Sequence, residues 1–428
     1  MKLKSVGKCI GKGLMKAGIA QAQWEYEMSQ NILNSKKRMI ILTVLAILPI
    51  IVGFAFADQL PVILGGKKAY APAYFLTKVL GVAIGIGLMA GLITGCIGAG
   101  GGFVITPALM SAGVKGIMAV GTDMFHIFAK AIMGTVVHKK LGNVSIKLAV
   151  AFVVGSFLGV NVGAAINKAI YTKSPVMSDA FISFVYVVLL GFLGFYALTD
   201  FLKLRRAAAS GVEVSTHGGG EGKKAKAATE LATTLQSVPL PPRISFDKEI
   251  VPGGRKIWAG FVAGCGFIVG VVAAIMGVGG GFLTFPMFVY ILGVSSFTTV
   301  GTDIFQIIFT AGYASVFKYA IYGFVFYSLA MGLLIGSLLG IQIGALTTKV
   351  VPGLYIRGFY ALAIIAGFFN RFLALPGKLT GIGVMHVSKA TSNALNMIGV
   401  IGFFVLISFF GIWVLMKFFA NLKTLKEG

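Results

Sequence analysis

The stretch Gly98–Phe103, which reads G-A-G-G-G-F, is followed closely by Pro107. The same pattern returns as G-V-G-G-G-F at Gly277–Phe282, followed by Pro286. Consecutive glycines weaken a helix interior, because each glycine costs about 1 kcal/mol relative to alanine. Each copy therefore predicts a break in a helix, with a new short helix beginning after it.

Two further pairs of blocks keep the same order along the chain. G-T-D occurs at Gly121–Asp123 and again at Gly301–Asp303, and G-S-F-L-G at 155–159 corresponds to G-S-L-L-G at 336–340. Each second copy lies about 180 residues after the first, so the pairs indicate one duplicated unit. The fold is expected to consist of two related halves.

The composition identifies lipid as the solvent of these halves. Of the 428 residues, 57% are hydrophobic and 12% are charged, whereas a soluble chain has about 25% charged residues. Several apolar runs approach the ~20 residues that a helix needs to cross a bilayer. We therefore predict an all-α, polytopic transmembrane helical bundle with two internal repeats that contain glycine-broken helices.

The distribution of charge predicts the domain layout and a cytoplasmic (inner) membrane protein with both termini in the cytoplasm. The N-terminal segment fits an amphipathic helix on an anionic leaflet or a basic tail, and the composition of the central linker indicates a segment that does not fold alone. The predicted parts are a basic cytoplasmic segment at 1–38, an extra transmembrane helix at 39–57, the first repeat at 74–202, the cytoplasmic linker at 203–256, the second repeat at 257–375, and a C-terminal loop, transmembrane helix and basic tail at 376–428.

The second half is predicted to be inverted relative to the first. The loop after the first G-T-D carries three lysines within 139–147, whereas its counterpart carries Lys318 only. The positive-inside rule predicts such an asymmetry for inverted repeats. The apolar segments at 103–113 and 282–293 are short, and re-entry there would lower the number of full crossings from about twelve to about eight to ten.

The net charge of +24 is assigned to topology and to anionic lipid headgroups, and not to nucleic acid, because the basic residues concentrate in the N-terminal segment, the linker and short loops. Cys9, Cys96 and Cys265 form no C-x-x-C pair, so neither a disulfide nor a metal site is expected. Motifs for nucleotide binding or hydrolysis are missing, which argues against an enzyme and predicts no cofactor. The expected partners are a small anion and membrane lipid, and a homo-oligomer stays open.

The glycine runs form the first candidate site. A helix that begins after a break presents free backbone amides and the positive end of its dipole, and both attract anions. One turn from each repeat could meet inside the bundle, as in transporters with discontinuous helices; close helix packing without a ligand is the alternative. The candidate residues are Gly100, Gly101 and Gly102 in the first half and Gly279, Gly280 and Gly281 in the second.

Ionisable residues within apolar helices form the second candidate. Asp123, His126 and Lys130 share one helix face through their spacing, and one interpretation is a proton-responsive line that couples or gates transport. The alternative is that the aspartates cap their helices near the membrane surface, with Lys130 paired internally and His126 a satisfied interior histidine. The counterparts in the second half are Asp303, Gln306 and Thr310.

Two amides occupy equivalent places in the later helices of each half, Asn161 and Gln342. Amides inside a bundle either bind a polar substrate or tie helices together through hydrogen bonds. Both interpretations are kept.

With the paired glycine blocks, the prolines and the G-T-D blocks in view, the chain resembles the TauE/SafE family of membrane permeases from about Tyr74 to Phe372. The resemblance implies export of sulfite, sulfoacetate or related organosulfur anions. The chain differs from the family pattern at Asp123 and Asp303, where the family often has serine, and in its basic N-terminal extension with an extra helix and its charged linker.

We therefore expect a secondary transporter that moves a small anion, sulfite or an organosulfonate, by alternating access. The glycine turns with Thr122 and Thr302 would hold the oxyanion, and Asp123 and Asp303 would couple or gate. A cation- or proton-coupled carrier or a passive channel that uses the two aspartates is the alternative, and a non-transporting membrane scaffold is a third class.

Overall fold

The computed structural model describes residues 77–97, 101–140, 144–209, 231–247, 254–348, 350–351 and 353–421. All of these belong to one compact unit that spans Asp58–Gly428. The predicted N-terminal segment, the predicted helix at 39–57 and Gly100 lie outside the described residues.

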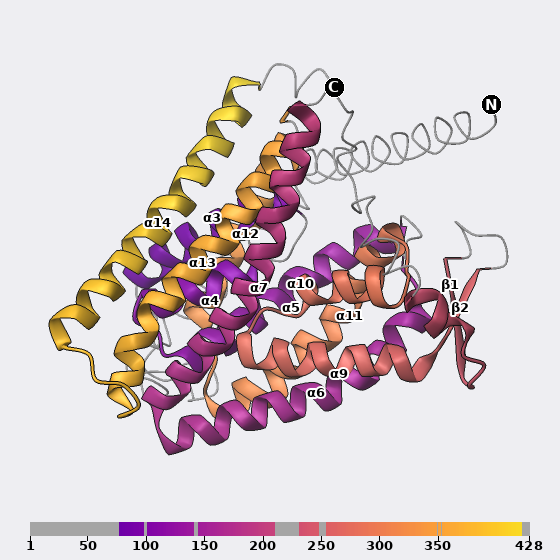
Figure 1. Cartoon of the computed structure of the whole chain (residues 1–428), viewed down its shortest axis with the longest axis horizontal. Helices are drawn as coiled ribbons and strands as arrows, with labels where there is room; N and C mark the ends of the chain where they lie inside the picture. Colours follow the sequence, from indigo (N-terminus) through magenta and orange to yellow (C-terminus); the bar gives the residue numbers. More distant parts are fainter. Residues whose placement is uncertain are drawn as a thin grey trace, which may run out of the picture. The chain divides into compact units, whose positions relative to one another are not determined.

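The described chain is almost entirely helical (Figure 1). The helices of the first half are α3 (Thr77–Ile97), α4 (Gly102–Ser111), α5 (Gly116–Lys140), α6 (Ile146–Lys173) and α7 (Pro175–Ala209). Their counterparts in the second half are α9 (Ala259–Met276), α10 (Gly281–Pro286) with the π-helix η2 (Met287–Ile291), α11 (Ser296–Tyr313) with η3 (Ala314–Tyr319) and η4 (Ala320–Tyr322), α12 (Tyr327–Thr347) and α13 (Gly353–Gly381). Helix α14 (Lys389–Ala420) follows both halves.

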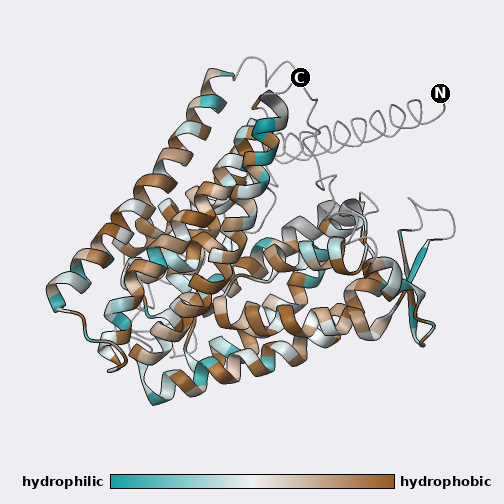
Figure 2. Cartoon of the chain, in the orientation of Figure 1, coloured by the Kyte–Doolittle hydropathy of each residue, from teal (hydrophilic) through white to brown (hydrophobic). Residues whose placement is uncertain are grey.

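Within the described residues, eight helices are long and apolar enough to cross a membrane, and the segments 102–111 and 281–291 form shorter apolar helices. Apolar residues cover long stretches of these helices, and polar residues concentrate near many of their ends (Figure 2). The predicted all-α polytopic bundle is confirmed. The two short helices follow the glycine runs, at the segments for which the sequence left full crossing or re-entry open.

Helices of one half pack against helices of the other through glycine-lined contacts. Helix α3 packs against α12 of the other half, and α9 packs against α6. Gly87 of α3 meets Leu333 and Gly91 meets Ser337, so residue numbers rise together and the two helices run parallel. A methyl group at Gly91 would lie 2.7 Å from the Cα atom of Ser337, which shows how closely the backbones approach.

Two pairs of equivalent helices, α7 with α13 and α5 with α11, pack antiparallel. In the α7–α13 pair, Gly194 faces Ile365 while Gly358 faces Phe201, so the numbers run in opposite directions. In the α5–α11 pair, Gly312 packs on the ring of Phe128, while Gly121, earlier in α5, meets Tyr319 of η3, which follows α11. Inverted halves require this order, and the orientation of each half in the bilayer stays a prediction.

Part of the central linker is ordered against the helices, although its composition predicts a segment that does not fold alone. Helix α7 extends to Ala209, residues 231–237 are helical, and β1 (Arg243–Phe246) pairs antiparallel with β2 (Arg255–Trp258). Phe246 and Ile257 are buried in an apolar cluster that also contains Phe288 of η2. The alternation of polar and apolar residues in R-I-S-F lets one face of the hairpin bury, which averaged composition does not reveal.

The hairpin is also held at the beginning of α11 by hydrogen bonds. The carboxylate of Asp247 accepts hydrogen bonds from the backbone N–H of Ser295 at 2.9 Å and from its hydroxyl at 2.7 Å. Ser295 caps α11 by accepting from the N–H of Thr298. The linker therefore contacts the helix that carries the second G-T-D block.

The two described cysteines, Cys96 and Cys265, are free and are partly or fully buried. The Cys96 thiol donates to the carbonyl of Gly344 across the α3–α12 contact. Both therefore occupy packing positions, and Cys9 lies outside the described residues.

Candidate functional site

The glycine run of the second half breaks a helix as predicted. Helix α9 ends at Met276, and Gly277, Gly279 and Gly280 have φ values of 79°, 66° and 86°. Only glycine adopts this left-handed region without a steric cost. Helix α10 then begins at Gly281, and no side chain caps its first amides.

In the first half, Gly101 precedes α4, again without a side-chain cap. Its φ is −69°, so the two turns differ in their backbone geometry. The first amides of both short helices have no acceptor within their own helix. They are the groups that the sequence analysis proposed for an anion.

The glycine turns of the two halves contact each other and α5. A methyl group at Gly102 would lie 2.9 Å from the Cα atom of Val278 in the other turn, and 3.1 Å from the side chain of Ile127. A methyl group at Gly279 would lie 2.8 Å from Ile127. The fold thus brings together two segments that are far apart in the sequence.

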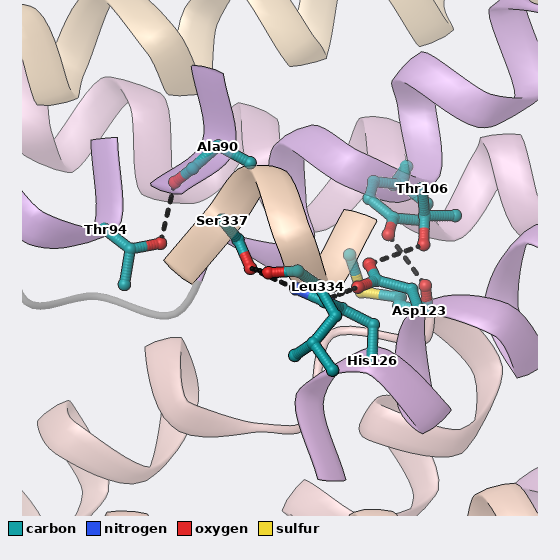
Figure 3. A network of polar contacts seen from close by, with 9 residues as sticks. Ala90, Thr94, Thr106, Asp123, His126, Leu334 and Ser337 are labelled. Carbon is teal, nitrogen blue, oxygen red and sulfur yellow. Dashed lines mark hydrogen bonds and ion pairs between the residues drawn. The ribbon is translucent and has the colours of Figure 1, made fainter. Parts of the chain in front are cut away.

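Asp123 is fully buried and begins a chain of polar contacts from α5 to α12 (Figure 3). Its carboxylate accepts from the hydroxyl of Thr106 at 3.0 Å, and Nδ1 of His126 lies 3.4 Å from the other carboxylate oxygen. Nε2 of His126 lies 2.8 Å from the hydroxyl of Ser337, which belongs to the second G-S-L-L-G block. The chain therefore links the two halves.

A corresponding chain begins at Asp303 and leads from α11 to α6. The side-chain amide of Gln306 donates to Asp303 at 2.9 Å, and the Thr310 hydroxyl donates to the Gln306 carbonyl oxygen at 2.7 Å. The hydroxyls of Thr310 and Ser156 are 2.8 Å apart. Ser156 belongs to the first G-S-F-L-G block, so the duplicated motifs build a duplicated polar chain.

Asp303 also lies beside the second glycine turn. A methyl group at Gly281 would be 3.0 Å from one of its carboxylate oxygens. A negative charge is favourable at the beginning of a helix. An anion at the first amides of α10 would therefore compete with this carboxylate when the carboxylate is ionised.

The threonines of the two G-T-D blocks accept hydrogen bonds from the other half. The Thr122 hydroxyl accepts from the N–H of Phe326, just before α12, at 2.9 Å. The Thr302 hydroxyl accepts from the N–H of Ser145, just before α6, at 3.0 Å. Both threonines thus satisfy backbone groups at the beginning of a helix, a role that the sequence analysis did not predict.

Replacing Thr122 by Val should lower the free energy of unfolding by about 1–3 kcal/mol, because the buried N–H of Phe326 would lose its acceptor while the shape is kept. Thermal unfolding of the purified protein measures this. Thr122→Ser keeps the hydroxyl and should stay close to wild type. Thr172→Val is the matched control, since the Thr172 hydroxyl is exposed and bonds only within its helix. Equal stability of Thr122→Val and Thr172→Val would contradict the assigned role.

The remaining predicted residues lie outside the two polar chains. Asn161 donates to the carbonyl of Phe157 at 2.8 Å and accepts from the Tyr313 hydroxyl at 3.1 Å, which ties α6 to α11. Gln342 is exposed on α12. Lys130 is half-buried on α5, and within the described residues no carboxylate lies within ion-pair distance of it.

Sequence reasoning missed several residues of this region. In the sequence, Ser156 and Ser337 are distinguished only by their place in a repeated block, and this repetition is the signal that points to them. Tyr186 donates to the carbonyl of Met276 at 2.7 Å and Asn167 donates to that of Ile275 at 3.1 Å. These bonds satisfy the carbonyl end of α9 at the break, and no local pattern marks either residue.

Comparison with known proteins gives a family and two relatives. Residues 83–370 match the family model described as Sulfite exporter TauE/SafE. A stretch of 97 residues, 22% of this chain, is 39% identical to the Probable membrane transporter protein YunE of Bacillus subtilis (strain 168) and covers 36% of its length. The Probable membrane transporter protein YjnA of the same organism is 22% identical over 265 residues, 61% of this chain and 87% of YjnA. No solved structure matches the chain.

Proposed function

The chain belongs to the sulfite exporter TauE/SafE family, and on that premise we propose that this multi-pass membrane transporter exports a small sulfur oxyanion, sulfite or an organosulfonate, by alternating access. The proposal includes the inner membrane as its location and the cytoplasm as the side of both termini. It also keeps the predicted layout of two membrane repeats around the linker at 203–256.

The contact between the two glycine turns carries the proposal. Each turn precedes a short helix whose first amides are uncapped, and Gly102 lies against Val278 of the other turn. The uncapped starts of α4 and α10 are therefore brought close to one contact between the halves. In the proposed alternating access the two halves move relative to each other, so that one site between them opens to either side in turn.

The aspartates provide a means of coupling in this proposal. An ionised Asp303 beside Gly281 repels an anion at the first amides of α10, whereas a protonated Asp303 does not. Binding of the anion and of a proton would therefore favour each other. The other polar chain, from Asp123 through His126 to Ser337, gives the first half a comparable titratable path.

Flux from liposomes tests the function. Proteoliposomes loaded with sulfite should release it faster than protein-free liposomes, and an imposed pH gradient should change the initial rate by about tenfold. Sulfate and isethionate loaded in parallel vesicles identify the accepted class. Release at the protein-free rate for every sulfur oxyanion would overturn the proposal.

The two polar chains favour one alternative, a carrier for a cation or proton that uses Asp123 and Asp303 as its ligands. The same vesicles separate it from the anion proposal. A cation carrier moves a monovalent or divalent cation, or acidifies the vesicle lumen, without any sulfur oxyanion present.

A further inference from the structure

We infer a second anion-binding position at Arg371 of α13, at the opposite end of α4 from the glycine turn. It rests on the proposed function, since its ligand is the transported oxyanion. Helix α4 begins after Gly101 and ends at Ser111, which separates the two positions by about 15 Å.

Arg371 is buried and held in a fixed orientation. Its side chain is 1% exposed. Its Nε donates to the side-chain oxygen of Asn370 at 2.7 Å, and one terminal nitrogen donates to the hydroxyl of Ser111 at 2.6 Å. The Asn370 amide in turn donates to the carbonyl of Gly399 on α14 at 3.1 Å. Three helices thus position one guanidinium.

In the described part of the chain, no carboxylate lies within ion-pair distance of the guanidinium. The nearby carboxylate of Asp179 pairs with Lys378 at 3.6 Å and accepts from the N–H of Gly116 at 2.7 Å. Asn370 and Ser111 are neutral, and the carbonyl end of α4 supplies about half an elementary charge. A buried cation without full compensation is costly in an apolar bundle, and such residues mark ligand paths.

The donor geometry fits an oxyanion. A guanidinium carries five N–H donors in one plane, and the two bonds to Asn370 and Ser111 leave others free to bind two oxygens of one anion. Sulfite, sulfonates and carboxylates present paired oxygens that match this fork. The Lys378–Asp179 pair lies closer to the ends of α13 and α7, so it would stand between Arg371 and the membrane surface.

The test measures initial rates of sulfite efflux against sulfite concentration in proteoliposomes. Arg371→Gln should raise KM about 10- to 100-fold with a smaller change in kcat, because a charge-assisted pair is lost. Arg371→Lys should recover part of the affinity, because it keeps the charge without the fork. Arg357→Gln is the matched control on the same helix, since Arg357 pairs with Asp200 at 3.2 Å, and its KM should stay within about twofold of wild type.

A second variant covers the case in which Arg371→Gln does not fold. Asn370→Asp keeps the side-chain shape and places a carboxylate beside the guanidinium, so the protein should fold while the anion faces a competing charge. Its KM should rise at least about tenfold, and sulfite should no longer raise the unfolding temperature of the purified protein at concentrations that stabilise wild type.

The outcomes separate this inference from the proposed function. Normal wild-type flux together with a wild-type KM in folded Asn370→Asp and Arg371→Lys overturns the role of Arg371 alone. Absence of flux in wild type overturns the proposed function instead. Stabilisation by sulfite that requires Arg371 would still support the binding position in that case, and its absence would overturn both.

Discussion

Replacing Asp123 by Asn should reduce sulfite efflux driven by a pH gradient by about 100-fold, the scale on which a positioned proton carrier contributes. Asn keeps the size of the side chain and can still accept from Thr106, whose hydroxyl lies 3.0 Å from the carboxylate. It cannot carry a proton to or from His126. Exchange of sulfite across the membrane without a gradient should be affected much less, because the glycine turns are unchanged.

The matched control is Asp200→Asn, because Asp200 pairs with Arg357 and is 34% exposed, away from the two polar chains. Asp303→Asn should resemble Asp123→Asn, and the double variant should lose gradient-driven efflux completely. Efflux that keeps its full dependence on the gradient in the double variant would exclude the coupling role. Loss of exchange together with gradient-driven efflux would favour the cation carrier.

Replacing Gly91 by Leu should prevent the protein from folding, and Gly91→Ala should lower the free energy of unfolding by about 1–3 kcal/mol. The added Cβ would lie 2.7 Å from the Cα of Ser337 and 3.0 Å from that of Gly340. Backbone atoms cannot rotate away, so the two helices would have to separate. The yield of monodisperse protein measures the first effect, and thermal unfolding measures the second.

Gly85→Ala is the control for this change, because it lies on the same helix and a Cβ there has nothing within 4 Å. It should leave stability unchanged or raise it by up to about 1 kcal/mol through helix propensity. If Gly91→Ala and Gly85→Ala were equally stable, the close approach of α3 and α12 would not contribute to stability.

The helices and the repeat were predictable because both leave local signals. Apolar runs such as 146–166 define a helix wherever lipid is the solvent, and the structure extends this one to Lys173. The glycine run at 277–281 predicted the break between α9 and α10, because the left-handed backbone at Gly277, Gly279 and Gly280 needs glycine. The hairpin at 243–258 was not predicted, because its burial depends on a surface that a distant helix provides.

The site was only partly predictable, because most of its partners come from the other half. The spacing of Asp123 and His126 placed them on one helix face, and the structure agrees. Nothing in the sequence indicated that His126 would meet Ser337, or that the Thr122 hydroxyl would accept from Phe326. Arg371 stands near the end of an apolar run in the sequence, and its burial in the fold is what distinguishes it.

Helices of one half pack against helices of the other, and this sets the order in which the interfaces can form during biosynthesis. Cys96 of α3 and its acceptor Gly344 of α12 are 248 residues apart, so at about 5–20 residues per second a ribosome needs roughly 10–50 s to supply the partner. The contact between Asn167 and α9 closes earlier, across 107 residues. The glycine face of α3 must therefore stay in the lipid, or against an insertion factor, until α12 has been synthesised. Slowed translation or truncation before α12 should leave it exposed to membrane quality control.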